Sequence, residues 1–224
     1  MQPQQIFQTK EEYAYQMIRQ AILTCEFKPD EKLVIDHLGI QLGISQIPIR
    51  AAMQRLQAEG LVHIIPHSGA VVSPIRPEKV EEIFSLLEVL EQTAFRYAAE
   101  KITQVDLVSL QELVKKLDAA ADQVDFKSWV GLNIQFHRQI AEISDMPLLL
   151  EFTHRILDEW QRLSNCYFQH LPPLRLLAAQ AEHHQIVLAL QTKDVERLQE
   201  IAVTHNRQAG QAYQNYFPTA KQKS

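Results

Sequence analysis

Long apolar runs, glycine and cysteine are all scarce in this chain of 224 residues. No apolar run approaches the roughly 18 residues that a membrane span needs, so we expect no membrane partner. The first residues lack the basic flank and the apolar segment of a signal peptide, which indicates a cytoplasmic protein. The two cysteines stand far apart, and they therefore predict neither a disulfide framework nor a CxxC zinc motif.

An excess of positive charge is also missing. The chain has 22 Lys and Arg residues against 27 Asp and Glu residues, which gives a net charge of −5 at pH 7. A globally basic nucleic-acid binder is therefore excluded. Basic and acidic residues balance over residues 1–77, so the whole negative excess falls in the C-terminal part. Any contact with DNA must come from the N-terminal part.

Turn-forming residues indicate a domain boundary about a third of the way along the chain. Four of the six glycines fall between residues 39 and 69. The segment "SPIRPEK", Ser73 to Lys79, then carries two prolines, each of which disfavours helix in the residue before it. We therefore predict two domains, residues 1–76 and residues 77–224.

The N-terminal domain has the element order of a winged helix-turn-helix. The predicted helices cover residues 10–25, 34–42 and 46–60, and the predicted strands cover residues 61–65 and 70–74. The buried face of the first helix is predicted to consist of Tyr13, Met17, Ile18, Ala21 and Ile22. Ser45 is the expected N-cap of the third helix. In such a fold the helix after the short turn enters the major groove of double-stranded DNA.

The first turn of that third helix has the chemistry of a base-reading surface. Its predicted buried stripe consists of Ile49, Ala52, Met53 and Leu56. Gln46 and Arg50 are four residues apart and therefore share an exposed face. Arg can bind guanine and Gln can bind adenine through paired hydrogen bonds. Pro48 fits the third helical position, since the N–H that proline lacks has no partner in a first turn. An ordinary amphipathic helix with a solvated polar face stays the alternative.

After residue 77 the periodicity is helical nearly to the end. The predicted helices cover residues 78–101, 103–122, 126–144, 147–168, 173–192 and 194–215. Helices joined by such short links form an all-α antiparallel bundle. The fold class that we expect is mainly α, with a winged helix-turn-helix followed by this six-helix bundle.

Three of these helices each place one histidine on the apolar face. His137 follows Asn133 by four residues on the first of them, and His183 and His205 lie within the apolar stripes of the last two. Buried polar groups need partners, so three inward imidazoles and an amide indicate either a site for a metal or a small anion, or a structural polar cluster. Imidazole ligands favour Zn²⁺ or Ni²⁺.

The segment "LGISQIPIRAAMQRLQAEGLV" resembles the signature of GntR-type transcriptional regulators, and the likeness extends over residues 10–75. The resemblance implies that Ser45, Gln46, Pro48 and Arg50 meet the operator, and that His67, Ser68 and Gly69 form the tip of the wing. Three positions depart from the family pattern. Gln46 replaces an Arg, Ile47 a Thr and Ala51 a Glu. Fewer positive charges at the groove predict either a different operator or weaker, less salt-dependent binding.

Residues 79–215 are similar to the FCD effector domain of the FadR subfamily, through "LNIQFHRQIAEIS" and "AEHHQIVLALQTKD". Many members bind a metal through one Asp and three His. The matching positions here are Asn133, His137, His183 and His205. The neutral amide of Asn133 is expected to weaken the binding of Zn²⁺ or Ni²⁺. Leu87 stands where the family often has an Arg that binds carboxylates, which indicates a less acidic effector.

The leading hypothesis is therefore a ligand-responsive repressor that binds a pseudo-palindromic operator as a homodimer, with a small-molecule effector or a metal in the helical domain. Two alternatives stay open. One is a helical metal-dependent hydrolase, although the chain lacks HExxH, GxSxG, a P-loop and an adjacent His-Asp pair, and we expect no enzyme. The other is a regulator whose histidine cluster is purely structural.

Overall fold

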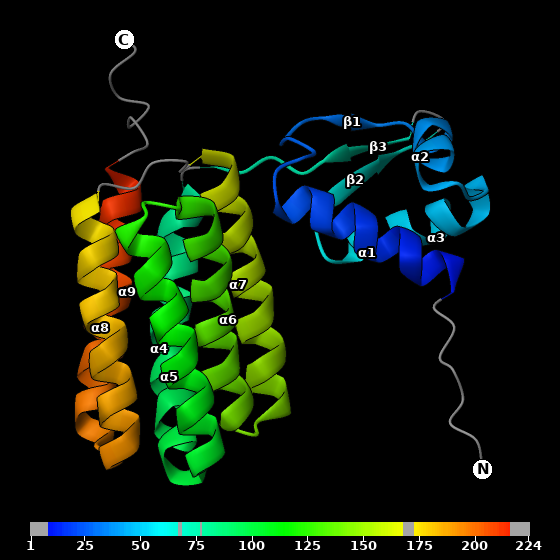
Figure 1. The fold of residues 1–224 in the computed structure, drawn as a ribbon. Helices are drawn as coiled ribbons and strands as arrows, with labels where there is room; N and C mark the ends of the chain where they lie inside the picture. The colour runs from blue at the N-terminus through cyan, green and yellow to red at the C-terminus, as the bar shows by residue number, and fades with distance from the viewer. Residues whose placement is uncertain (1–8, 67–68, 77, 168–172, 216–224) are drawn as a thin grey trace, which may run out of the picture. The chain divides into compact units, whose positions relative to one another are not determined.

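A computed structural model describes residues 9–66, 69–76, 78–167 and 173–215 (Figure 1). The chain divides into two compact units, Met1–Ile75 and Arg76–Ser224. Within the described ranges, all strands belong to the first unit and the second unit is entirely helical. The predicted fold class, a winged helix-turn-helix followed by a helical bundle, is confirmed. None of the described helices combines the length and the apolarity needed to cross a bilayer.

Three helices and a small sheet make up the first unit. The helices are α1 (Lys10–Leu23), α2 (Ile35–Leu42) and α3 (Gln46–Ala58), and the strands are β1 (Lys32–Leu33), β2 (Val62–Ile65) and β3 (Gly69–Val72). The strands pair antiparallel in the order β1-β3-β2. Strand β1 was not predicted, because two residues are too few to show a period of two. It forms because β3 offers a second edge to Lys32 and Leu33.

The core of the first unit lies between its three helices and one face of the sheet. The predicted stripe of α3 is confirmed, since Ile49, Ala52, Met53 and Leu56 are at most 1% exposed. The predicted face of α1 is partly wrong. Tyr13 and Met17 are 38% and 46% exposed. Ala14 is buried instead, so the inward face is rotated toward Ala14, Ile18 and Ile22.

Two glycines hold the geometry of this unit. Gly43 ends α2 at a φ of 67°, which makes the tight turn before α3. Gly69 opens β3 at a φ of 104° beside strand β1. A Cβ atom there would lie 2.5 Å from the carbonyl oxygen of Leu33, so no other residue fits without a shift of the backbone.

The helices of the second unit begin and end within one residue of their predicted bounds. They are α4 (Glu78–Lys101), α5 (Gln104–Asp122), α6 (Phe126–Ile143), α7 (Pro147–Tyr167), α8 (Pro173–Thr192) and α9 (Val195–Gln214). The breaks have local causes. Thr103 and Asp106 form a capping box at the start of α5. Val124, Asp145 and Lys193, each with a positive φ, end α5, α6 and α8.

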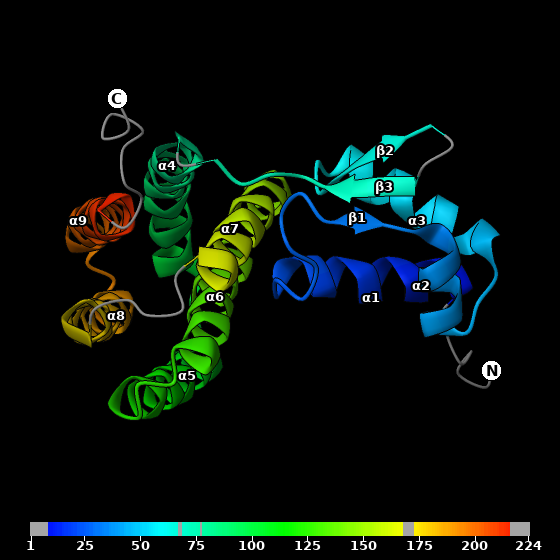
Figure 2. The same ribbon diagram turned by 90° about the horizontal axis from the view of Figure 1, so that it is seen from above.

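The six helices pack side by side around one interior (Figure 2). Helix α4 packs against α9 and α7, and α8 packs against α9 and α5. Helix α6 lies between α5 and α7 and also contacts α4. The inner faces of α4, α6, α8 and α9 are therefore brought together, and the inward histidines lie on three of them.

Candidate functional site

The first turn of helix α3 is not capped by the side chain of its N-cap residue. Ser45 occupies the N-cap position, but its side chain makes no capping hydrogen bond, so the predicted cap is wrong in this respect. Pro48 is the third residue of the helix, as predicted. Because the hydroxyl of Ser45 does not cap them, the N–H groups of the first turn are left to bind an anion.

Gln46 and Arg50 lie together on the exposed face of this turn. The guanidinium of Arg50 donates to Oε1 of Gln46 at 3.3 Å, and Nε2 of Gln46 donates to Oδ1 of Asp36 at 2.5 Å. Ile47, between them in sequence, is 80% exposed. This surface therefore offers an amide, a guanidinium and an apolar side chain, with one carboxylate from α2 beside them.

An open groove of about 580 Å³ runs beside Arg50. It is lined by residues at the start of α2, by the end of β2 and by Gly69 at the start of β3. The predicted wing-tip residues His67 and Ser68 lie outside the described residues, and Gly69 is half-buried. Helix α3 and strands β2 and β3 therefore border the same groove.

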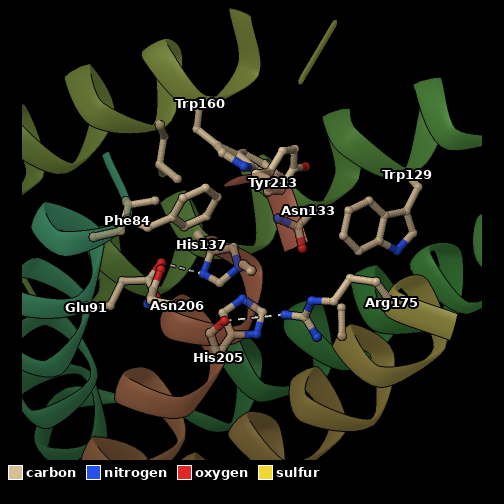
Figure 3. Close-up of a pocket in the computed structure, with 14 residues that line it drawn as sticks. Phe84, Glu91, Trp129, Asn133, His137, Trp160, Arg175, His205, Asn206 and Tyr213 are labelled. Carbon is tan, nitrogen blue, oxygen red and sulfur yellow. Dashed lines mark hydrogen bonds and ion pairs between the residues drawn. The ribbon is translucent and has the colours of Figure 1, made fainter. Parts of the chain in front are cut away.

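The second constellation is a buried polar cluster inside the bundle. Asn133 and His137 come from α6, His183 from α8 and His205 from α9. All four side chains are buried, with exposed fractions between 0% and 6%. One nitrogen from each of the three imidazoles lies within 4.8 Å of the others, a spacing that a single metal ion could bridge. Figure 3 shows His137, His205 and Asn133 converging from their helices.

Each imidazole has an acceptor beside its Nδ1 atom. Oε1 of Glu91 lies 2.7 Å from Nδ1 of His137, in an ion-pair contact whose alignment is poor for a hydrogen bond. Nδ1 of His205 contacts Oε2 of Glu182 at 2.5 Å. Nδ1 of His183 contacts Oε1 of Gln180 at 2.9 Å. Metal-binding histidines typically use the second ring nitrogen in this way, which fixes the ring and leaves Nε2 for the ion.

Three buried side-chain atoms of the cluster lack a hydrogen-bond partner. They are Oδ1 of Asn133, Nε2 of His183 and Nδ1 of His137, which has only its ion-pair contact with Glu91. Such unsatisfied atoms cost free energy in an interior unless something binds them. A donor set of three imidazole nitrogens and one amide oxygen fits a four-coordinate divalent cation such as Zn²⁺. The residues present therefore fit the metal that the FCD resemblance implies.

Burial sets the protonation of the cluster. Desolvation holds the pKa of His183 well below its usual value, and the neighbouring imidazoles add to this effect. Desolvation also lowers the pKa of His205, although its contact with Glu182 opposes the shift. Burial acts to raise the pKa of Glu91, but His137, His205 and Asn206 outweigh it and lower the pKa. His183 and His205 are thus held neutral, which is the form that binds metals.

The cavity at this cluster is small, and its lining includes four large aromatic side chains. About 30 Å³ is open to the centre of a water-sized sphere, enough for one or two waters. Aromatic side chains of Phe84, Trp129, Trp160 and Tyr213 line it (Figure 3). Arg175 also lines it and is held by a two-pronged ion pair to Glu182.

Several residues at the cluster were not predicted from the sequence. Glu91, Glu182 and Gln180 hold the imidazoles, and Arg175 lines the cavity. Of these, Gln180 had a usable signal, since it precedes His183 by three residues on the same helix and therefore shares its face. Leu87, where the family often has an arginine, also lines the cavity.

Two family models match the chain. "Bacterial regulatory proteins, gntR family" matches residues 10–72, and "FCD domain" matches residues 82–208, more than half of the chain. The chain belongs to the GntR family. It carries both the DNA-binding and the FCD domain of that family, as the two resemblances implied.

Relatives of this GntR-family chain are transcriptional regulators. The HTH-type transcriptional regulator McbR of Escherichia coli strain K12 is 30% identical over 172 residues, 75% of this chain and 76% of that protein. The HTH-type transcriptional repressor RspR of the same strain is 24% identical over 191 residues, 85% of this chain and 83% of that protein. This protein is accordingly a DNA-binding regulator and not an enzyme, so the hydrolase alternative is set aside.

Solved structures of GntR-family proteins share the fold. That of E. coli McbR/YncC superposes with a TM-score of 0.82 at 25% identity, over 93% of this chain and 99% of that one. A GntR-family regulator from Pseudomonas syringae pv. tomato superposes with a TM-score of 0.55 at 24% identity, over 92% of this chain and 87% of that one. The second likeness concerns the fold alone.

Proposed function

We propose that this GntR-family regulator is a repressor that binds a pseudo-palindromic operator as a homodimer and responds to an occupant of the histidine cluster. Residues 1–76 would bind DNA, and residues 77–224 would dimerise and bind the effector. Repression is supported by the relative named as a repressor, RspR of E. coli. A homodimer presents two copies of α3 to two half-sites about one helical turn of DNA apart, which is why a palindrome is expected.

The observation that carries the DNA-binding proposal is the exposed first turn of α3. Gln46 and Arg50 already contact each other there, so they would read adjacent base edges in the major groove. Ile47 would meet a thymine methyl group, the apolar feature of that groove. Ser45 and the N–H groups near Pro48 would bind a phosphate. The wing residues His67, Ser68 and Gly69 would reach the minor groove or the backbone.

Gel-shift titration of the protein's own promoter region tests this proposal. A bidentate contact to a base is worth about 1–3 kcal/mol, so Arg50→Ala should weaken binding by roughly 5-fold to 150-fold. Arg96→Ala is the matched control, because Arg96 is an exposed arginine on α4 in the other unit. Equal affinities of the wild type and Arg50→Ala for the promoter would contradict the proposal.

For the helical unit we propose a divalent metal, Zn²⁺ or Ni²⁺, held by Asn133, His137, His183 and His205. Support comes from the convergent ring nitrogens, from the contacts that hold Nδ1 of His183 and Nδ1 of His205, and from the unsatisfied Oδ1 of Asn133 and Nε2 of His183. When bound, the ion would supply a fixed positive charge to which an effector oxygen or nitrogen could attach. Glu91 and Glu182 orient the rings. Asn133 lowers the affinity, because its amide oxygen is neutral where a carboxylate would be charged.

Elemental analysis tests the metal, using protein purified without chelators and without an affinity tag. About one metal per chain, lost in His183→Asn, supports the site. No metal in the wild type, even after soaking in Zn²⁺ or Ni²⁺, favours the purely structural cluster. His154→Asn is the control, because His154 lies on α7, which supplies none of the four candidate ligands.

Coupling between the two units would follow from which helices the cluster joins. Its candidate ligands come from α6, α8 and α9, and Glu91 adds α4. An effector that attaches at the cluster and is larger than the present cavity would thus change the packing of four helices at once. We propose that this change alters the spacing of the two α3 helices in the dimer. Binding at the cluster would then change the affinity for DNA through two conformations of the dimer, which is an allosteric mechanism.

A further inference from the structure

Gln180 on α8 occupies a buried position between the histidine cluster and the surface. Its side chain is 5% exposed and makes three contacts in different directions. Oε1 faces Nε1 of Trp129 at 3.0 Å and Nδ1 of His183 at 2.9 Å. Nε2 donates to Oδ1 of Asp118, on α5, at 2.7 Å. One amide therefore links α5, α6 and α8 at a single point.

The orientation of this amide follows from the chemistry of two neighbours. The indole nitrogen of Trp129 can only donate a hydrogen bond, so the atom facing it must be the amide oxygen. The carboxylate of Asp118 only accepts, so the atom facing it must be the amide nitrogen. The two requirements agree. A flipped amide would place donor against donor at Trp129 and acceptor against acceptor at Asp118.

Asp118 is itself held from the solvent side. Nε2 of His184 lies 3.0 Å from Oδ2 and 3.1 Å from Oδ1 of Asp118. His184 faces away from the apolar stripe of α8 and is more than half exposed at its side chain. The contact with His184 fixes the carboxylate of Asp118, and this carboxylate in turn orients Gln180.

The oriented amide then determines the state of His183. Since Oε1 of Gln180 is an acceptor, Nδ1 of His183 must carry the hydrogen, and Nε2 keeps its lone pair. Nε2 is buried without a hydrogen-bond partner, and the ring stands beside those of His137 and His205. We infer that Gln180, oriented by Trp129 and Asp118, is a positioning residue that fixes the tautomer of His183 and aims its Nε2 lone pair at the proposed metal.

This role differs from those of the other two supports. His137 and His205 contact the carboxylates of Glu91 and Glu182, in which both oxygens can only accept a hydrogen bond. His183 contacts a neutral amide whose direction is set by Trp129 and Asp118. The inference about the tautomer stands on the metal-free protein, while its consequence for affinity rests on the metal site proposed above.

Nitrogen NMR of uniformly ¹⁵N-labelled, metal-free full-length protein tests the tautomer directly. Long-range ¹H–¹⁵N spectra distinguish Nδ1–H from Nε2–H imidazole, and the His183 signals are assigned by their loss in His183→Asn. We expect the Nδ1–H form in the wild type. Gln180→Leu removes the acceptor and should give a mixture of tautomers, whereas Gln180→Glu keeps an acceptor and should restore the Nδ1–H form.

Calorimetric titration with Zn²⁺ or Ni²⁺ alone tests the consequence. Loss of such a supporting contact typically weakens metal binding by about 10-fold to 100-fold, which we expect for Gln180→Leu. Gln180→Glu should recover a part of that loss. The control is Gln191→Leu, an exposed glutamine on the same helix. A merely structural role would lower the melting temperature of Gln180→Leu without changing the tautomer.

The outcomes separate the two proposals. Nε2–H as the wild-type tautomer, or an unchanged tautomer in Gln180→Leu, overturns the inference about Gln180. The expected tautomers together with weaker binding in Gln180→Leu support it. The expected tautomers without any binding to the wild type support the role of Gln180 in fixing His183 and overturn the proposed metal site.

Discussion

Replacing Asn133 by Asp tests the histidine cluster through stability. Asn133 is 3% exposed and its Oδ1 atom has no hydrogen-bond partner. Asp has nearly the same shape, so the substitution adds a negative charge without a change in packing. In the metal-free protein this charge is buried among imidazoles of which two, His183 and His205, are held neutral. An uncompensated buried charge costs about 3–5 kcal/mol.

The lower end of that range applies, because Asn133 lines a cavity with room for a water that can donate to the carboxylate. A loss of about 3 kcal/mol lowers the melting temperature of a domain of this size by roughly 6–12 °C. A bound divalent cation would pair the charge and cancel the loss. Suppose that the metal-bound forms of the wild type and of Asn133→Asp are equally stable. The thermodynamic cycle that links folding and metal binding then requires the variant to bind the metal about 150-fold more tightly.

The assay is thermal unfolding in a chelator and again in excess Zn²⁺ or Ni²⁺. The wild type, Asn133→Asp and Gln135→Glu are compared, since Gln135 is an exposed amide on the same helix and undergoes the same change of charge. We expect the metal to raise the melting temperature of Asn133→Asp far more than that of the other two. An equal rise in all three would refute the reasoning, because the carboxylate would then not be a ligand.

Two further predictions concern the DNA-binding unit. Asp36→Asn removes the negative charge that holds Gln46 and should tighten operator binding about fivefold in low salt, as measured by fluorescence anisotropy; weaker binding would mean that Asp36 is needed to orient Gln46. Gly69→Ala should destabilise the unit by about 1–3 kcal/mol, because φ is 104° and the new Cβ would meet strand β1, whereas Gly131→Ala in open helical surroundings should be neutral or stabilising. Equal melting temperatures for these two glycine variants would contradict the strain assigned to Gly69.

The sequence predicted the helices well because the breaks between them are local. A capping residue or a left-handed residue ends each helix within a few positions of the pattern that defines it, as at Thr103 and Lys193. The inward histidines were also predictable, since a period of 3.6 residues determines which side chains share a face. Burial of His137, His183 and His205 follows from that period alone.

Other features depend on contacts between distant parts of the chain. Glu91 supports His137 because α4 and α6 pack together, and no periodicity within either helix contains that information. Strand β1 exists only as a partner of β3. Tyr13 has the spacing of a core residue but forms no part of the inward face, whereas the adjacent Ala14 is buried there. The Glu91 contact, strand β1 and the inward face of α1 therefore depend on pairing and packing between residues that are distant in sequence.

The small volume beside the histidines determines what kind of occupant could act as a signal. About 30 Å³ accommodates an ion with its water, and such an occupant fits the bundle as it stands. A ligand that binds two conformations equally well changes the population of neither, however tightly it binds. An organic molecule larger than this space can enter only when Phe84, Trp129 and Tyr213 move apart, and it therefore favours an expanded bundle. Size would thus separate an occupant that only stabilises the bundle from one that switches it.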